Sequence, residues 1–198
     1  MIGLTGSIAM GKTTVARMFA DEGVPVFDSD AAVHDLYRGA AVQPIEACFP
    51  NVTIDGRIDR VRLAARVIGA PAALRQLEAI VHPLVESARR KFVSAERTML
   101  RKMLILDVPL LFETAGEQAV DLVIVVTAPA RIQRARALSR GGMTSERLDE
   151  IIKRQMPDFE KRRRAHFLVD TSVSLESTRQ QVRDFVQAAS GMSRGSAN

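Results

Sequence analysis

The N-terminal segment of the chain constrains the fold most strongly. Residues 2–5, IGLT, form a short apolar run, and residues 6–13, GSIAMGKT, follow directly and fit the pattern G-x-x-x-x-G-K-[ST]. The glycines of this pattern permit a tight turn whose backbone N–H groups face an anion, and the helix that follows adds its positive N-terminal end. The sequence therefore predicts a strand, a phosphate-binding loop and a helix from Lys12 to Glu22.

This loop predicts the binding of a nucleoside triphosphate, with ATP and Mg²⁺ as the expected cofactors. We expect the backbone N–H groups to hold the phosphates, Lys12 to reach the β- and γ-phosphates, and the Thr13 hydroxyl to bind Mg²⁺. The candidate nucleotide-binding residues are Gly6, Ser7, Ile8, Ala9, Met10, Gly11, Lys12, Thr13 and Thr14.

Further short apolar runs predict a parallel sheet. They lie at residues 24–27, 103–106, 122–126 and 166–170, and their apolar residues follow one another instead of alternating with polar ones. Strands of this kind are covered by helices on both faces. Helices are predicted at residues 129–140 and 174–189, so we expect an α/β, three-layer P-loop NTPase fold with a parallel central sheet.

The stretch from residue 30 to residue 102 interrupts this alternation. It shows no convincing strand, and helices are predicted at residues 31–38, at 61–68 and from His82-Pro83 onward. Such a stretch exceeds a normal crossover and is typical of an inserted lobe that selects the substrate. We therefore expect one P-loop kinase domain over residues 1–198. Its parts are a core (1–29, 103–128, 165–190), a helical acceptor-binding lobe (30–102) and a lid (129–164).

The charge pattern indicates an anionic partner. The formal net charge is +5, and only five of the 28 basic residues are lysines, whereas guanidinium groups match phosphate oxygens well. With one Tyr and no Trp there is little to stack on bases, which argues against nucleic acid. The basic run at residues 161–164 is therefore expected to be solvated or to steer anionic substrates.

We expect neither a membrane protein nor a secreted protein. No run of 18 apolar residues occurs, and the N-terminus enters the loop motif without a signal-like segment. Cys48 is the only cysteine and lies among apolar residues, so it is predicted to be a buried side chain in a cytoplasmic protein. The sequence specifies no oligomeric state.

Three classes of P-loop protein are compatible with these features. The patterns D-x-x-G and N-K-x-D of GTPase switches are absent, which favours a small P-loop kinase. Within this class the alternatives are a small-molecule kinase and a nucleoside kinase. The basic charge alone leaves a nucleotide-gated RNA-binding protein as the third.

Over about residues 2–187 the chain resembles dephospho-coenzyme A kinases. The resemblance rests on GLTGSIAMGKTTVA, VFDSD, IDR followed by Leu63, LE-x-IVHP, VPLLFE, Gln133 with Arg136 and Arg140, and Gln155. It implies transfer of the ATP γ-phosphoryl group to the ribose 3′-hydroxyl of 3′-dephospho-coenzyme A, with Mg²⁺. The chain departs from the family in GSIAMGKTT, where members often have GGIGSGKST, and in Thr171, where they often have Asn.

On the acceptor side, the resemblance implies that Asp30 is the catalytic carboxylate that activates the acceptor hydroxyl. The alternative is that Ser29 or Asp30 caps a helix beginning at Ala31, and for Asp28 catalysis and capping are equal alternatives. Arg60 is expected to bind the acceptor pyrophosphate, with a surface ion pair as the alternative.

Three further residues are expected near the acceptor. The same resemblance implies that His82 contacts the acceptor. The alternative is that His82-Pro83 only marks the start of a helix. Pro109 and Leu110 are expected to form a wall of the acceptor site.

The remaining candidates surround the transferred phosphoryl group. Asp107 ends an apolar run, where a carboxylate can act in the second shell of Mg²⁺ or as a structural residue. Arg136 and Arg140 lie four apart on one helical face before Gly141-Gly142, which predicts a lid whose arginines neutralise the γ-phosphoryl charge. The alternative is a solvated basic face. Glu113 is expected to pair with an arginine.

Overall fold

The computed structural model describes residues 1–192 and divides the chain into two compact units. One unit comprises Met1–Phe27 with Leu100–Asn198, and the other comprises Asp28–Met99. No helix among the described residues is long and apolar enough to cross a membrane.

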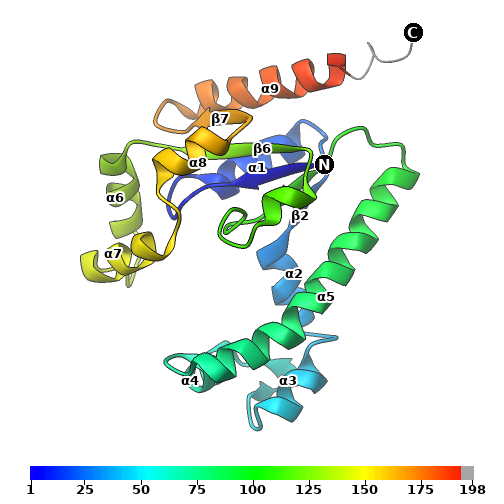
Figure 1. Cartoon of the computed structure of the whole chain (residues 1–198), viewed down its shortest axis with the longest axis vertical. Helices are drawn as coiled ribbons and strands as arrows, with labels where there is room; N and C mark the ends of the chain where they lie inside the picture. The colour runs from blue at the N-terminus through cyan, green and yellow to red at the C-terminus, as the bar shows by residue number, and fades with distance from the viewer. Residues whose placement is uncertain (193–198) are drawn as a thin grey trace. The chain divides into compact units, whose positions relative to one another are not determined.

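A five-stranded sheet forms the centre of the first unit (Figure 1). The strand order is β2 (Val26–Asp28), β5 (Ile105–Asp107), β1 (Ile2–Thr5), β6 (Leu122–Thr127) and β7 (Phe167–Asp170). The pairs β1–β5, β1–β6 and β6–β7 are parallel, and β1 is buried along its whole length. The prediction of a parallel sheet from the apolar runs is therefore confirmed.

Helices α1 (Lys12–Asp21) and α9 (Leu175–Met192) cover one face of this sheet. Phe19 of α1 and Phe185 of α9 meet edge to face with ring centroids 5.9 Å apart, in the same cluster as Leu4 and Ile124 of the sheet. Edge-to-face pairs of this kind add to the gain from burying the rings.

The opposite face carries a second apolar cluster, in which Leu111 and Phe112 pack on Val123 and Val125 of β6. The short helices η1 (Gly116–Ala119) and α8 (Asp158–Arg164) belong to this layer. The three-layer architecture is therefore confirmed.

The segment predicted as the lid, residues 129–164, contains two short helices before α8. Helix α6 (Ala130–Leu138) and helix α7 (Ser145–Arg154) contact each other, and Ala137 and Leu148 are buried between them beside Ala9. An ion pair of 2.7 Å from Arg134 to Asp149 also joins them.

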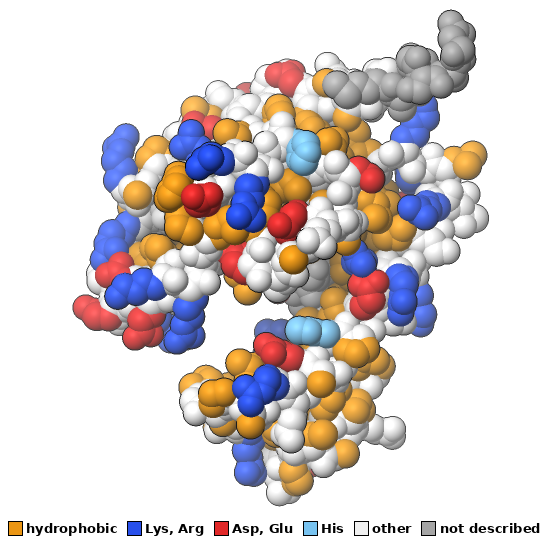
Figure 2. All heavy atoms as spheres, viewed as in Figure 1, with side chains coloured by type: hydrophobic (Ala, Val, Ile, Leu, Met, Phe, Trp, Pro, Cys, Tyr) orange, Lys and Arg blue, Asp and Glu red, His pale blue; other side chains and the backbone are white. Residues whose placement is uncertain are grey.

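On the face drawn in Figure 2, basic side chains alternate with acidic and apolar ones instead of forming one basic surface.

The second unit is mainly helical. Its elements are α2 (Ser29–Leu36), α3 (Val42–Cys48), β3 (Thr53–Ile54), β4 (Arg57–Ile58), α4 (Arg60–Val67) and α5 (Pro71–Thr98). Its own core includes Ile45, Phe49, Leu63 and Leu77, so the unit buries apolar side chains independently of the central sheet.

The expectation that residues 30–102 contain no strand is wrong. Strands β3 and β4 form an antiparallel hairpin whose turn residues Asp55 and Gly56 have φ of 48° and 72°. Asp-Gly is a strong signal for a two-residue hairpin turn because both positions require positive φ. The strands are two residues long, which leaves no run for an apolar pattern to reveal.

Two further expectations about this unit are wrong. Pro83 lies inside α5 instead of starting a helix. Its missing N–H costs about 3 kcal/mol, and burial of Leu77 and Val81 before it, with packing of Leu84 after it, offsets that cost. Cys48 is exposed, because Ile45 and Phe49 take the core positions of α3 and its end.

Candidate functional site

Two glycines shape the loop between β1 and α1. A Cβ at Gly6 would lie 2.7 Å from the Val126 carbonyl oxygen, so only glycine permits this approach of the loop to β6. Gly11 has φ of +91° and forms the N-cap of α1. Such a conformation favours glycine, which explains the second invariant position of the motif pattern.

The loop presents a row of free backbone donors. Among the described residues, the N–H groups of Ala9, Gly11, Lys12 and Thr13 meet no acceptor, and no side chain caps α1. Unpaired N–H groups at a helix N-terminus, together with the helix dipole, form an anion site. The backbone geometry therefore suits the phosphates of a nucleotide.

Lys12 forms an ion pair with Asp107 at the end of β5. Asp107 is 3% exposed and lies opposite Leu4 in the parallel pairing of β1 and β5, which brings it beside the start of the loop. Thr13 is exposed on the first turn of α1, and its hydroxyl has no partner among the described residues. The structure thus brings Lys12 and Asp107 together, as two strand ends at one sheet edge imply.

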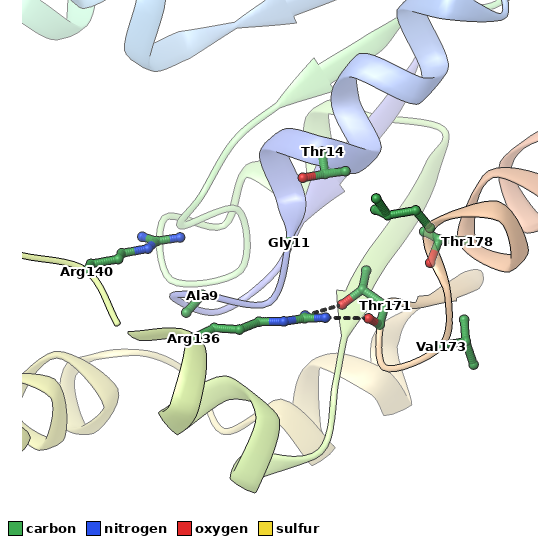
Figure 3. A pocket seen from close by; sticks show the side chains of 9 residues that line it. Ala9, Gly11, Thr14, Arg136, Arg140, Thr171, Val173 and Thr178 are labelled. Atoms are coloured by element: carbon green, nitrogen blue, oxygen red, sulfur yellow. Dashed lines mark hydrogen bonds between the residues drawn. The ribbon is translucent and has the colours of Figure 1, made fainter. Parts of the chain in front are cut away.

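A pocket of about 340 Å³ lies beside the loop (Figure 3). Arg136 reaches across from α6, where its two terminal nitrogens donate to Thr171, at 2.8 Å to the hydroxyl and 2.6 Å to the carbonyl oxygen. The Thr171 hydroxyl in turn donates to the Met10 carbonyl at 2.7 Å. Arg140 also lines this pocket, so both predicted arginines lie at the loop. Helix α6 ends at Leu138, however, so the prediction that the two arginines share one helical face is wrong.

The far wall of the pocket was missed by sequence reasoning. It consists of Thr171, Val173, Leu175 and Thr178, at the end of β7 and the start of α9. The only signal was Thr171, which occupies the position where related sequences often carry Asn. Thr171 bonds to both Arg136 and the loop, so it fixes the loop instead of only facing the pocket.

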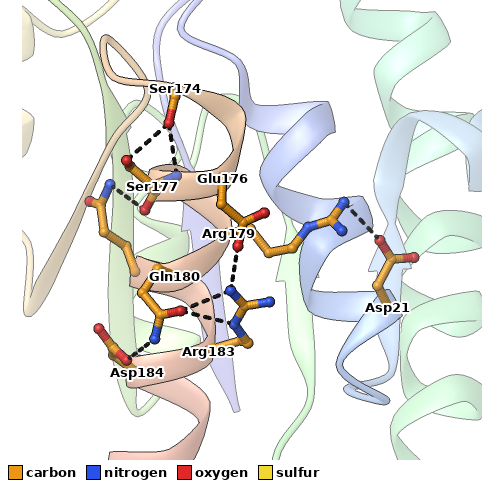
Figure 4. Close-up of polar contacts among 9 residues, drawn as sticks. Asp21, Ser174, Glu176, Ser177, Arg179, Gln180, Arg183 and Asp184 are labelled. Atoms are coloured by element: carbon orange, nitrogen blue, oxygen red, sulfur yellow. Dashed lines mark hydrogen bonds and ion pairs between the residues drawn. The ribbon is translucent and has the colours of Figure 1, made fainter.

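Polar contacts hold this wall in place. The Ser174 hydroxyl accepts from Ser177 N–H at 3.1 Å and caps α9, and Arg179 of α9 pairs with Asp21 of α1 at 3.8 Å (Figure 4). The start of α9 is therefore attached to α1, the helix that carries the loop.

In the second unit, Asp28 is the N-cap of α2. Its carboxylate accepts from the N–H groups of Asp30 and Ala31 at 2.9 and 3.0 Å. The predicted capping by Ser29 or Asp30 is therefore wrong, because the helix begins two residues earlier, at Ser29. The Asp30 carboxylate is exposed and has no partner among the described residues.

Arg60 lines a pocket of about 160 Å³ within this unit, together with Arg38 and Arg57. Its guanidinium lies 5.8 Å from the centre of the Tyr37 ring. Burial raises the pKa of the Tyr37 hydroxyl, and the positive charge of Arg60 opposes that rise. Three guanidinium groups around one pocket give it a positive charge, which is the charge that favours an anion.

The other predicted acceptor residues lie on different elements of the two units. His82 is exposed on α5 and does not line the arginine pocket. In the first unit, the Pro109 carbonyl accepts from the Thr5 hydroxyl at 3.1 Å, and Leu110 is exposed. The turn after β5 is therefore attached to the end of β1.

The partner of Glu113 is Lys161, not an arginine. The two charged groups lie 2.8 Å apart, with side chains 17% and 0% exposed, so the expectation of a wholly solvated basic run is wrong for its first residue. Burial alone would raise the pKa of Glu113, but Lys161 and the N–H of Met156 outweigh burial and lower it. Lys161 is the one buried residue of α8, whereas the three arginines after it complete the last turn of that helix.

Comparisons with known proteins agree with this geometry. A family model described as dephospho-CoA kinase matches residues 1–177. A dephospho-CoA kinase of Mesorhizobium japonicum is 52% identical over 196 residues, covering 99% of each chain.

Solved structures show the same fold. A crystallised protein of Thermus thermophilus is 34% identical with a TM-score of 0.79, covering 94% of this chain and 95% of that one. A dephospho-CoA kinase from Campylobacter jejuni has a TM-score of 0.73 at 22% identity, covering 96% and 97%. The phosphate-binding loop, the arginines beside it and the full-length similarity together place this chain in the dephospho-CoA kinase family.

Proposed function

We propose that this chain transfers the γ-phosphoryl group of ATP to the ribose 3′-hydroxyl of dephospho-coenzyme A, the last step of coenzyme A synthesis. The observation that carries the proposal is the row of unpaired N–H groups at the start of α1, beside Lys12, Arg136 of α6 and Arg140, which follows α6. A family match over most of the chain supports dephospho-CoA as the acceptor.

The loop holds the nucleotide phosphates. Gly6, Ser7, Ile8, Ala9, Met10, Gly11, Lys12, Thr13 and Thr14 supply the loop and the first turn of α1. When phosphates bind, Lys12 turns its ammonium from Asp107 toward the β- and γ-phosphates, which offer more negative charge than one carboxylate.

The oxygen donors of the site fit Mg²⁺. The exposed Thr13 hydroxyl would be a direct ligand, and Asp107 would act through a water molecule once Lys12 has left it. Hydroxyl and carboxylate oxygens are the ligands that this hard cation prefers. Bound Mg²⁺ would neutralise part of the charge on the β- and γ-phosphates.

Asp30 orients the acceptor hydroxyl and takes its proton late in the transfer. A carboxylate is a weak base for a sugar hydroxyl, so positioning is the larger part of this role in a loose transition state. The exposed carboxylate of Asp30, without a partner among the described residues, is available for this contact, whereas Asp28 is occupied as a cap.

Four further residues complete the proposed acceptor contacts. Arg60 binds its pyrophosphate, with Arg38 and Arg57 adding positive charge to the same pocket. From the family resemblance we infer that other parts of the acceptor contact His82, Pro109 and Leu110.

Arg136 and Arg140 bind the nucleotide and stabilise the charge of the transferring group. Arg136 is oriented by its two bonds to Thr171, and Arg140 lines the same pocket. The lid (129–164) excludes water, since hydrolysis competes with transfer. The acceptor-binding lobe (30–102) and the core (1–29, 103–128, 165–190) complete a single kinase domain over residues 1–198, and we place the protein in the cytoplasm.

An ADP-release assay with a panel of acceptors tests this function. With dephospho-CoA the purified protein should release ADP far faster than with nucleosides, shikimate or gluconate, and Lys12→Ala should abolish that release. Stimulation by a nucleoside and none by dephospho-CoA would leave a P-loop kinase and contradict the proposed acceptor. Stimulation by RNA alone would favour a nucleotide-gated RNA-binding protein.

A further inference from the structure

The peptide groups of Ile8 are held on both sides by glutamine side chains. The Ile8 N–H donates to the side-chain oxygen of Gln155 at 3.1 Å, and the Ile8 carbonyl accepts from the side-chain nitrogen of Gln133 at 2.9 Å. Backbone N–H can only donate and a carbonyl can only accept, so each glutamine amide has one possible orientation. No other loop residue is held by side chains at both its N–H and its carbonyl among those described.

Ile8 lies where a change of backbone would disturb the phosphate site. The next residue, Ala9, has φ of +61°, an unfavourable conformation for a residue with a Cβ. The unpaired N–H groups of Ala9, Gly11 and Lys12 follow directly. Fixing the Ile8 peptide therefore fixes the start of the segment that would face the phosphates.

The two glutamines belong to the lid segment and not to the loop. Gln133 is 7% exposed and lies on α6, one turn before Arg136, and Gln155 is the C-cap of α7. Arg136 reaches the loop through Thr171, which donates to Met10. Helix α6 thus contacts the loop backbone at Ile8 directly and at Met10 through one intermediate.

The backbone next to Gln155 is held by a carboxylate of the layer under β6. The N–H of Met156, the next residue, donates to Glu113 at 2.8 Å, and Glu113 is paired with the buried Lys161. The chain direction at residue 155 is therefore set by the layer under β6, while its side chain reaches the loop. These contacts connect the end of α7 both to the phosphate-binding loop and to the layer under β6.

We infer that Gln133 and Gln155 are positioning residues for the phosphate-binding loop: they hold the Ile8 peptide so that the neighbouring N–H groups stay directed at the nucleotide phosphates. Neither glutamine needs to touch the nucleotide. The inference rests on the proposed nucleotide site of this kinase and is independent of the acceptor's identity.

The test compares Gln155→Leu and Gln155→Glu, because leucine removes the acceptor oxygen and glutamate retains it. Gln187→Leu, on the exposed surface of α9, is the matched control. The first readout is hydrogen exchange of the Ile8 amide in nucleotide-free protein, followed by NMR. Gln155→Leu should speed this exchange, whereas Gln155→Glu and Gln187→Leu should leave it protected.

The second readout is binding of a non-hydrolysable ATP analogue with Mg²⁺ by calorimetry, together with steady-state kinetics. Loss of one hydrogen bond should raise the Kd of the analogue and the KM for ATP about five- to tenfold in Gln155→Leu, with the KM for dephospho-CoA unchanged. Gln133→Leu should do the same with the Ile8 N–H still protected, since it releases the carbonyl instead.

Unchanged Kd in both leucine variants would overturn the inference. An equal rise in KM for both substrates, or a fall in thermal midpoint that accounts for the loss of binding, would also overturn it in favour of a purely structural role. If the wild-type protein binds the analogue but phosphorylates a different acceptor, the proposed function fails and the positioning role stands.

Discussion

Replacing Glu113 with glutamine is expected to destabilise the protein by about 3–5 kcal/mol, because it leaves an ammonium in the interior without its counter-charge. The Lys161 side chain is 0% exposed and lies 2.8 Å from Glu113, yet its ammonium meets no acceptor in hydrogen-bonding geometry. The interaction is therefore one of charge, and a neutral amide does not replace it.

A double-mutant cycle separates the free-energy cost of the unpaired Lys161 ammonium from the other effects of replacing Glu113. Lys161→Met removes the buried ammonium and leaves Glu113, which is 17% exposed and still accepts from Met156 N–H, so this variant should lose less stability. The double variant Glu113→Gln/Lys161→Met should be more stable than Glu113→Gln alone. The exposed pair Arg134–Asp149 supplies a control, since Asp149→Asn should leave the thermal midpoint close to that of the wild type.

The assay is thermal and urea unfolding followed by circular dichroism at neutral pH. At about 2–4 °C per kcal/mol for a chain of this size, Glu113→Gln should lower Tm by about 6–20 °C. A Tm within a degree of the wild type, or a double variant no more stable than Glu113→Gln, would refute the reasoning that the buried ammonium depends on this carboxylate.

Three other predictions concern the site and its support. Lys12→Ala should lower kcat by a far larger factor than its effect on unfolding would explain, measured by ADP release and Tm; normal turnover would remove the loop mechanism. Asp30→Asn should retain ATP binding by calorimetry and lose transfer, and an equal loss of both would indicate a structural role. Folding lowers the pKa of Glu113, so as the pH falls the unfolded chain takes up this proton at a higher pH than the folded chain does. The free energy of unfolding of the wild type should therefore fall more steeply below pH 4.5 than that of Glu113→Gln. Parallel acid-unfolding curves would argue against this.

The parts of the fold that follow local rules could be predicted from the sequence. Apolar runs such as residues 122–126 predict buried parallel strands, and the glycine-lysine pattern of residues 6–13 predicts the loop and the helix that begins at Lys12. These features depend on residues close together in the chain. Asp107 also ends an apolar run, but its place beside the loop depends on the pairing of β5 with β1, which lies far from it in the chain.

The parts that were wrong depend on partners distant in the chain. A proline within α5 is tolerated only because apolar residues on both sides of it are buried, which no local pattern reveals. The burial of Lys161 depends on Glu113, which lies in a different segment of the chain. The Asp55-Gly56 hairpin is the exception, since its turn signal was present in the sequence.

Mass spectrometry and ³¹P NMR of the reaction products test the central claim most directly. Incubation of the purified protein with ATP, Mg²⁺ and dephospho-CoA should give coenzyme A with one new phosphomonoester at the ribose 3′ position, in amounts equal to the ADP formed. ADP with inorganic phosphate and unchanged dephospho-CoA, or phosphorylation at another hydroxyl, would contradict the account.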